Sequence, residues 1–231
     1  LMYTNAFTKM KPMTSRYVLM LGEDGMIKDD GIVCKINDNH FIATTTTSGA
    51  PKVLADMEEY AQTEWPHLNV YMNSITEQFS TFNISGPKSR AIMRKVFRDI
   101  DFSNKKIPFM HFNQFKYLDT EVRIMRASFT GELGYEIYVP PKYALELWKK
   151  IFHNGKNLGL VPYGTETMHL LRAEKGYVVI GQDTDGTVTP IDLNLNWMIG
   201  KNKKDFIGKR SLSRTDTSRK DRKQLVGILP L

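Results

Sequence analysis

Two short motifs hold carboxylates in positions where they could take part in chemistry. In the first, Asp29 and Asp30 closely follow the tight turn 22–25, in a segment that predicts a strand. Because neighbouring strand residues point to opposite faces, one of the two must face the interior. A buried carboxylate without a partner is costly, so we expect the inward one to have a partner, such as a cationic or N–H-bearing ligand. The alternative is that both are surface charges at the end of a loop.

The second motif is TGELGYE at 130–136. Glu136 stands between Tyr135 and Ile137 in an otherwise apolar strand, so it faces the opposite side from these two residues. A carboxylate there can accept two parallel N–H donors from a heteroaromatic ring, for example a 2-amino-4-oxopteridine. The alternative, about equally plausible, is that Glu136 simply lies on the solvent-exposed face of a hairpin.

Other polar stretches give weaker indications. Segments 164–177 and 181–186 contain glycines that could cradle an anion, but neither has a P-loop or dinucleotide-binding pattern. His169 could serve as a base on a predicted helix, although a single helical histidine is more often structural or on the surface. The sequence has no Cys/His cluster with zinc-site spacing, and we expect no metal.

The elements that position these residues form two β-rich units with interspersed helices. Strands and helices do not alternate regularly, so the predicted fold class is α+β rather than doubly wound α/β. The helix at 165–175 is expected to have Thr165 as its N-terminal cap. The predicted strands are 16–21, 26–35, 40–47, 70–71, 78–84, 121–129 and 135–139, and the predicted helices are 51–63, 88–98, 141–153 and 165–175.

Composition and charge exclude several classes of protein. The chain has 231 residues, of which 41% are hydrophobic, enough to bury a core, and no apolar run is long enough for a transmembrane helix. A single cysteine allows no internal disulfide, which favours a reducing compartment such as the cytoplasm. Residues 1–200 carry no net charge, and 201–231 carry the whole net charge of +7. Nucleic-acid binding along the body is therefore disfavoured.

Four motifs, at 17–21, 25–30, 85–90 and 130–136, resemble the folate-binding aminomethyltransferases, whose type member is the T-protein of the glycine cleavage system. Further stretches narrow the resemblance to the C-terminal part of the α subunit of heterotetrameric sarcosine oxidases; they are 63–66, 163–177, 181–190 and 205–212.

This resemblance implies the aminomethyltransferase fold with a truncated C-terminal barrel. We expect a first folate-binding unit at 1–82, a second at 83–200, and a basic connector with the first barrel strand at 201–231. The chain begins with Leu1 and ends in an apolar run at 224–231, so we expect a fragment of a longer polypeptide. A mature amino terminus at Leu1 is the alternative.

The resemblance also assigns roles to single residues. It implies that Asp30 is the catalytic carboxylate beside the folate nitrogens and that Tyr17 lines the folate pocket. It further implies that the strand around Thr44 and Thr46 supplies backbone contacts to the folate and that the Glu136 carboxylate binds the pteridine ring. One departure concerns Thr165, which with Glu166 stands where the T-protein has an Arg–Asp pair that contacts folate.

The implied reaction is a one-carbon transfer that depends on tetrahydrofolate. In the resembled enzyme a flavin held by the β subunit oxidises sarcosine, and the resulting imine reacts with tetrahydrofolate to give 5,10-methylenetetrahydrofolate. The implied partners are reduced folate and the β, γ and δ subunits, with flavin and NAD bound outside this chain. No nucleic acid or membrane is expected. The alternatives are a stand-alone aminomethyltransferase or methyl-transferring demethylase, and a folate-binding module without catalysis.

The basic segment 201–223 has two interpretations. It can be a solvated linker, since runs of charge usually are. It can also dock on an acidic subunit or attract anionic polyglutamyl folate, and both effects would be screened by salt.

Overall fold

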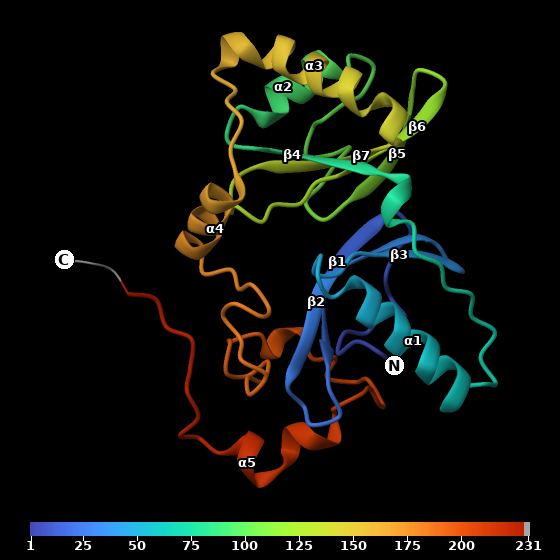
Figure 1. The fold of residues 1–231 in the computed structure, drawn as a ribbon, viewed down its shortest axis with the longest axis vertical. Helices are drawn as coiled ribbons and strands as arrows, with labels where there is room; N and C mark the ends of the chain where they lie inside the picture. The colour runs from blue at the N-terminus through green and yellow to red at the C-terminus, as the bar shows by residue number, and fades with distance from the viewer. Residues whose placement is uncertain (229–231) are drawn as a thin grey trace. The chain divides into compact units, whose positions relative to one another are not determined.

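A computed structural model describes residues 1–228, which form two compact units. The first unit contains 1–12, 16–73 and the chain from 178 onward, and the second contains 13–15 and 74–177. These units differ from the three consecutive segments expected from the sequence, because the chain returns to the first unit after residue 177 (Figure 1). No helix of the described residues is both long and apolar enough to cross a membrane.

The first unit is built on a three-stranded sheet with the order β1 (Thr14–Leu21), β2 (Ile27–Asn37) and β3 (His40–Ala43). Alternate residues of β1 enter two different apolar clusters, so both faces of the sheet are covered. On one face, Val18 and Met20 pack with Val53 of helix α1 (Ala50–Thr63) (Figure 1). On the other, Leu19 and Leu21 pack with residues of the segment that follows 178.

A tight turn joins β1 to β2. The Gly22 N–H donates to the Met26 carbonyl (2.9 Å), and the Met26 N–H donates to Oδ1 of Asp24 (3.0 Å). Gly25 has a φ of +86°, a left-handed conformation that glycine adopts without strain. The predicted strands at 16–21 and 26–35 are thereby confirmed as a hairpin.

From residue 178 to residue 228 the chain contains two short 3-10 helices, Asn196–Met198 and Arg210–Ser213, and the short helix α5 (Thr215–Ser218). The strand expected within 224–231 does not form at 224–228, and 229–231 lie outside the described residues. The described chain therefore contains no closed barrel.

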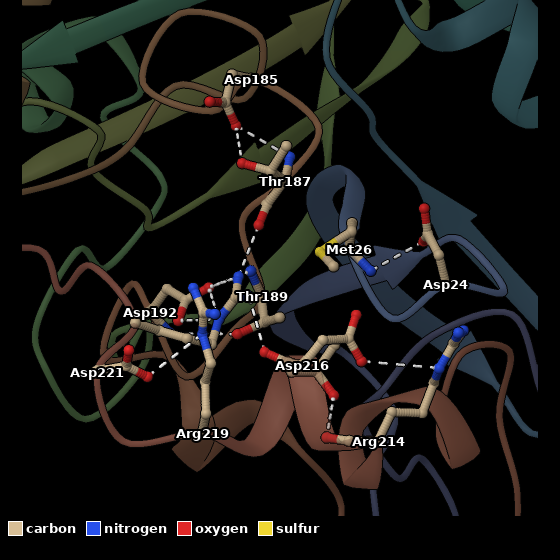
Figure 2. Close-up of polar contacts among 12 residues, drawn as sticks. Asp24, Met26, Asp185, Thr187, Thr189, Asp192, Arg214, Asp216, Arg219 and Asp221 are labelled. Atoms are coloured by element: carbon tan, nitrogen blue, oxygen red, sulfur yellow. Dashed lines mark hydrogen bonds and ion pairs between the residues drawn. The ribbon is translucent and has the colours of Figure 1, made fainter.

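Part of the basic segment 201–223 is integrated into the first unit. The Lys203 ammonium donates to the carbonyls of Tyr3 (2.6 Å) and Asn5 (2.9 Å). The Arg222 guanidinium binds the carboxylate of Asp192, with the shortest contact at 2.6 Å. Asp192 also accepts a hydrogen bond from the Thr189 N–H (Figure 2). These cations serve internal contacts, so the segment is not simply a solvated linker.

The second unit contains a four-stranded antiparallel sheet. Helices α2 (Ser89–Val96) and α3 (Ala144–Gly155) cover one face of it, over a core that includes Tyr135, Ile137 and Val139 of the central strand β7 (Figure 1). The strand order is β4 (Ser80–Ser85), β7 (Gly134–Val139), β6 (Thr120–Met125) and β5 (Phe112–Tyr117).

Further expectations for secondary structure were wrong. The strand predicted at 70–71 is absent, and β5 lies in a region where the sequence predicts no element. Helix α4 (Thr165–Glu174) forms as predicted, but its N-terminal cap is Gly164 and no side chain caps it.

Candidate active site

The β1–β2 hairpin brings Tyr17 and Asp30 together. The Tyr17 hydroxyl donates a hydrogen bond of 2.5 Å to Oδ2 of Asp30, and both side chains are partly buried. The resemblance therefore named two residues that the fold places in direct contact.

This contact lies in an environment that changes the acidity of both groups. Burial raises the pKa of Asp30 to about 6, the Tyr17 hydrogen bond opposes that rise, and the charge of Asp29 adds to it. Burial also raises the pKa of Tyr17, and the charge of Asp30 and the hydrogen bond to it add to the rise. The phenol therefore stays protonated as a donor, while the carboxyl can gain or lose a proton near neutral pH.

Asp29 is the inward carboxylate of the pair. It is 4% exposed, and it has Thr46 of the same chain as a partner. The Thr46 N–H donates to Oδ1 of Asp29 (3.0 Å), and the Thr46 hydroxyl donates to Oδ2 (2.8 Å). The expectation that an inward aspartate has a partner is confirmed, although the partner found is a threonine of the chain and not the suggested ligand, and the alternative of two loop-end surface charges is wrong.

Thr44 and Thr46 lie just after β3, which ends at Ala43. The Thr44 N–H donates to the Ile32 carbonyl (2.9 Å), and the Thr44 hydroxyl accepts from the Ile32 N–H (3.0 Å). With the Thr46 N–H held by Asp29, both backbone donors serve the protein itself. Backbone contacts from these two threonines to a ligand would have to use carbonyl oxygens.

Glu136 belongs to the second unit, on the sheet face opposite the helices. The strand register pairs it with Asn83 of β4 and Met125 of β6, so these side chains share that face. The Tyr138 hydroxyl, two residues along the same strand, donates to Oε2 of Glu136. Burial raises the pKa of Glu136, and the Tyr138 hydrogen bond opposes the rise. The residue remains partly exposed.

Thr165 is the first residue of α4 and is exposed. Arg172, further along this helix, donates to the Tyr177 carbonyl (3.0 Å). Because that bond closes the C-terminal end of α4, Arg172 has a structural role here.

The predicted site residues thus form two groups. Tyr17, Asp30, Thr44 and Thr46 belong to the first unit, and Glu136 and Thr165 to the second. Sequence reasoning missed Tyr138, although strand alternation places it on the same face as Glu136. It also missed the Thr46 partner of Asp29, which no local pattern indicates.

Comparisons with known proteins agree with this architecture. A family model described as the GCVT N-terminal domain matches residues 1–203. The sarcosine oxidase subunit alpha of Corynebacterium sp. (strain U-96) is 48% identical over 232 residues, which cover 100% of this chain and 24% of that protein. The aminomethyltransferase of Chlorobium limicola is 34% identical over 208 residues, which cover 90% of this chain and 56% of that protein.

A solved structure gives the same result for the fold. The glycine cleavage system aminomethyltransferase T from Bartonella henselae superposes with a TM-score of 0.74 at 24% identity, over 91% of this chain and 55% of that one. The chain thus spans about a quarter of the sarcosine oxidase relative and just over half of the aminomethyltransferase relative. The α+β class predicted from the order of the elements and the aminomethyltransferase fold implied by the resemblance are both confirmed, and the chain belongs to the GCVT N-terminal domain family.

Proposed function

We propose that this chain is the tetrahydrofolate-dependent one-carbon transfer module of a sarcosine oxidase α subunit. The observation that carries the proposal is the contact between Tyr17 and Asp30, a carboxyl with a pKa of about 6 beside a phenol that stays protonated. The similarity to sarcosine oxidase α subunits along the whole chain supports the choice of substrate.

Asp30 has the properties that the chemistry requires. When bound, tetrahydrofolate would supply the amine nitrogens that take up the one-carbon unit, together with the protons that Asp30 would accept. At neutral pH most Asp30 carboxyls are ionised, because the pKa lies about one unit lower. A carboxylate stabilises the iminium cation electrostatically and accepts a proton from nitrogen. It can then return that proton to the departing amine, which here is glycine.

Tyr17 gives Asp30 a defined orientation. Its hydroxyl donates to Oδ2 and so holds the carboxyl in one direction. Because the phenol stays protonated, it remains a donor throughout the neutral range.

Glu136, taken within the second unit alone, suits the 2-amino-4-oxo ring of a reduced folate. A 2-amino-4-oxo ring presents two parallel N–H donors, and a carboxylate is the acceptor that matches them. Tyr138 holds Oε2 of Glu136, while the remaining lone pairs of the carboxylate can still accept. The residues present therefore fit the ring, and Glu136 would bind and orient it. A contact of folate with Thr165 stays a prediction, to which this exposed side chain would bring only a neutral hydroxyl.

In this proposal the flavin and NAD chemistry belongs to other parts of the assembly. The relatives are named as α subunits, so we expect β, γ and δ subunits as partners. This chain would then receive the imine, exclude competing hydrolysis and complete the transfer to folate.

The test uses the intact enzyme with sarcosine and tetrahydrofolate. We expect Asp30→Asn to reduce formation of 5,10-methylenetetrahydrofolate roughly 100-fold or more, while sarcosine oxidation continues at the wild-type rate. Free formaldehyde, from hydrolysis of the untransferred imine, should replace the folate product. A variant that still makes methylenetetrahydrofolate at the wild-type rate would show that Asp30 is not the catalytic group.

Two further outcomes would favour the alternatives. If the wild-type protein binds tetrahydrofolate without any transfer in the assembly, it is a binding module. If it transfers a one-carbon unit without a flavin partner, it is a stand-alone transferase.

A further inference from the structure

Asp29 joins strand β2 to the loop that precedes helix α1. Its two carboxylate oxygens accept from the N–H and the hydroxyl of Thr46, a residue 17 positions further along the chain. The carboxylate is nearly inaccessible to solvent, so these bonds replace those that water would make. Asp29 is therefore a link between two segments rather than a free charge.

The loop 44–49 lies in direct contact with β2, with no space for a larger side chain between them. A Cβ added to Gly31 would lie 1.9 Å from the Thr44 carbonyl oxygen, and one added to Gly49 would lie 2.0 Å from Oδ2 of Asp29. A side chain at 31 would force the backbone apart, and one at 49 would displace the Asp29 carboxylate and the Thr46 hydroxyl. The close approach of loop and strand thus depends on glycine at both positions.

The links to this loop flank Asp30 along β2. Asp29 binds Thr46 on one side, and Ile32 exchanges two hydrogen bonds with Thr44 on the other. Asp30 lies between these attachment points, so the direction of its carboxyl depends on both.

The charge of Asp29 also acts on the groups around it. Tyr3 and Tyr17 lie near enough for their pKa values to be raised by it, Tyr3 to about 12 with burial as the larger cause. The Tyr3 hydroxyl is buried and has no hydrogen-bond partner among the described residues. Asp29 also raises the pKa of Asp30, after the larger effect of burial. Asp29 thus acts on Asp30 in two ways, through the loop that it holds and through its charge. The two effects can be tested separately.

We propose that Asp29 is a positioning residue for Asp30, which holds the loop 44–49 against β2 through Thr46 and so fixes the Asp30 carboxyl beside Tyr17. The inference rests on the proposed function, because a fixed direction of Asp30 matters only if that carboxyl handles the proton.

Two substitutions at Asp29 separate position from charge. Asp29→Asn keeps an oxygen for the Thr46 N–H and offers an amide N–H to the Thr46 hydroxyl, whereas Asp29→Ala removes both contacts. In the intact protein without folate, we expect Asp29→Ala to speed hydrogen exchange in 44–50 by roughly tenfold or more. The same variant should slow methylenetetrahydrofolate formation by roughly tenfold. Asp29→Asn should leave exchange near the wild-type rate.

The pH profile gives a readout that a purely structural role would not move. Asp29→Asn removes a negative charge whose effect is to raise the pKa of Asp30. The acidic limb of the transfer rate should therefore move to lower pH in this variant. Asp24→Asn is the matched control, since Asp24 is an exposed carboxylate in the turn of the same hairpin.

Thr46 provides a second test if Asp29→Ala does not fold. Thr46→Ser keeps the hydroxyl and should leave exchange in 44–50 near the wild-type rate, whereas Thr46→Val removes it and should speed that exchange. The inference would be overturned if Asp29→Ala and Thr46→Val both kept wild-type hydrogen exchange in 44–50 and wild-type methylenetetrahydrofolate formation. It would also be overturned if exchange became faster while methylenetetrahydrofolate formation stayed at the wild-type rate. The exchange measurement needs no folate, so absence of transfer in the wild-type protein would instead count against the proposed function.

Discussion

The Tyr17 hydroxyl donates a 2.5 Å hydrogen bond to the Asp30 carboxylate across two neighbouring strands. The bond favours the ionised carboxyl, whereas burial, the larger effect, favours the neutral one. Together they leave the pKa at about 6, close enough to neutrality for proton exchange. The acidity of Asp30 is therefore a balance that a single substitution can shift.

Tyr17→Phe should raise the pKa of Asp30, because it removes the hydrogen bond that opposes burial. The acidic limb of the rate of methylenetetrahydrofolate formation should move to higher pH, with a loss of several-fold at pH 7. A pH–rate profile measures the shift. The control is Tyr60→Phe, whose hydroxyl binds Glu23 at an exposed site of the same unit. A profile that stays in place for Tyr17→Phe would show that the bond does not set the acidity.

Asp30→Asn should stabilise the protein at neutral pH. A carboxyl whose pKa is raised from 3.8 to about 6 on folding makes its full contribution to the free energy of unfolding only below pH 4. This contribution is lost as pH rises through 6, because ionising the buried carboxyl lowers the free energy of unfolding by as much as about 3 kcal/mol. The amide avoids this cost, so its advantage in the free energy of unfolding should be absent at pH 4 and largest above pH 7. Urea unfolding at both pH values tests this, and a less stable variant at pH 8 would contradict it.

Local patterns predicted most of the fold because they encode burial. Tyr135, Ile137 and Val139 alternate along β7 and are fully buried, so the position of Glu136 on the opposite face could be read from the sequence. The strand predicted at 70–71 failed because the fold provides it with no partner strand. Strand β5 was missed because polar residues interrupt its apolar ones.

The parts that could not be predicted are contacts between distant residues. Asp29 pairs with Thr46, and Asp192 pairs with Arg222 across 30 residues. Composition showed that 201–231 is basic, but it could not show which cations have internal partners. The roles of Asp30 and Tyr17 came from the resemblance to a family, and the structure adds that the two side chains touch.

Glu136→Gln should weaken the binding of tetrahydrofolate by roughly 10- to 100-fold, since a charged acceptor for two N–H donors becomes a neutral amide. The Tyr138 hydroxyl can still donate to the amide oxygen, so the fold should persist. Calorimetric titration with tetrahydrofolate measures the change. Glu132→Gln, at an exposed position in the same motif, should bind as wild type. Equal affinity of the two variants would exclude Glu136 from the folate site.

Arg222→Ala should destabilise the first unit by about 3 kcal/mol, because it leaves a buried carboxylate without its guanidinium. Burial alone would raise the pKa of Asp192, but hydrogen bonds from Arg222 and Thr189 hold it below its usual value. The side chains of Asp192 and Arg222 are only 7% and 16% exposed. The stabilisation should therefore be present at neutral pH and decline as pH falls and Asp192 is protonated.

The matched control for this prediction is Arg219→Ala. Arg219 pairs with Asp221 at 3.3 Å, but the two side chains are 59% and 78% exposed (Figure 2). Its loss should change the free energy of unfolding by less than about 1 kcal/mol. Urea unfolding of the intact protein at pH 7 compares the two variants. Equally small effects of both variants would show that the contact between Arg222 and Asp192 does not stabilise the first unit, whereas a large effect of Arg222→Ala alone would show that it does.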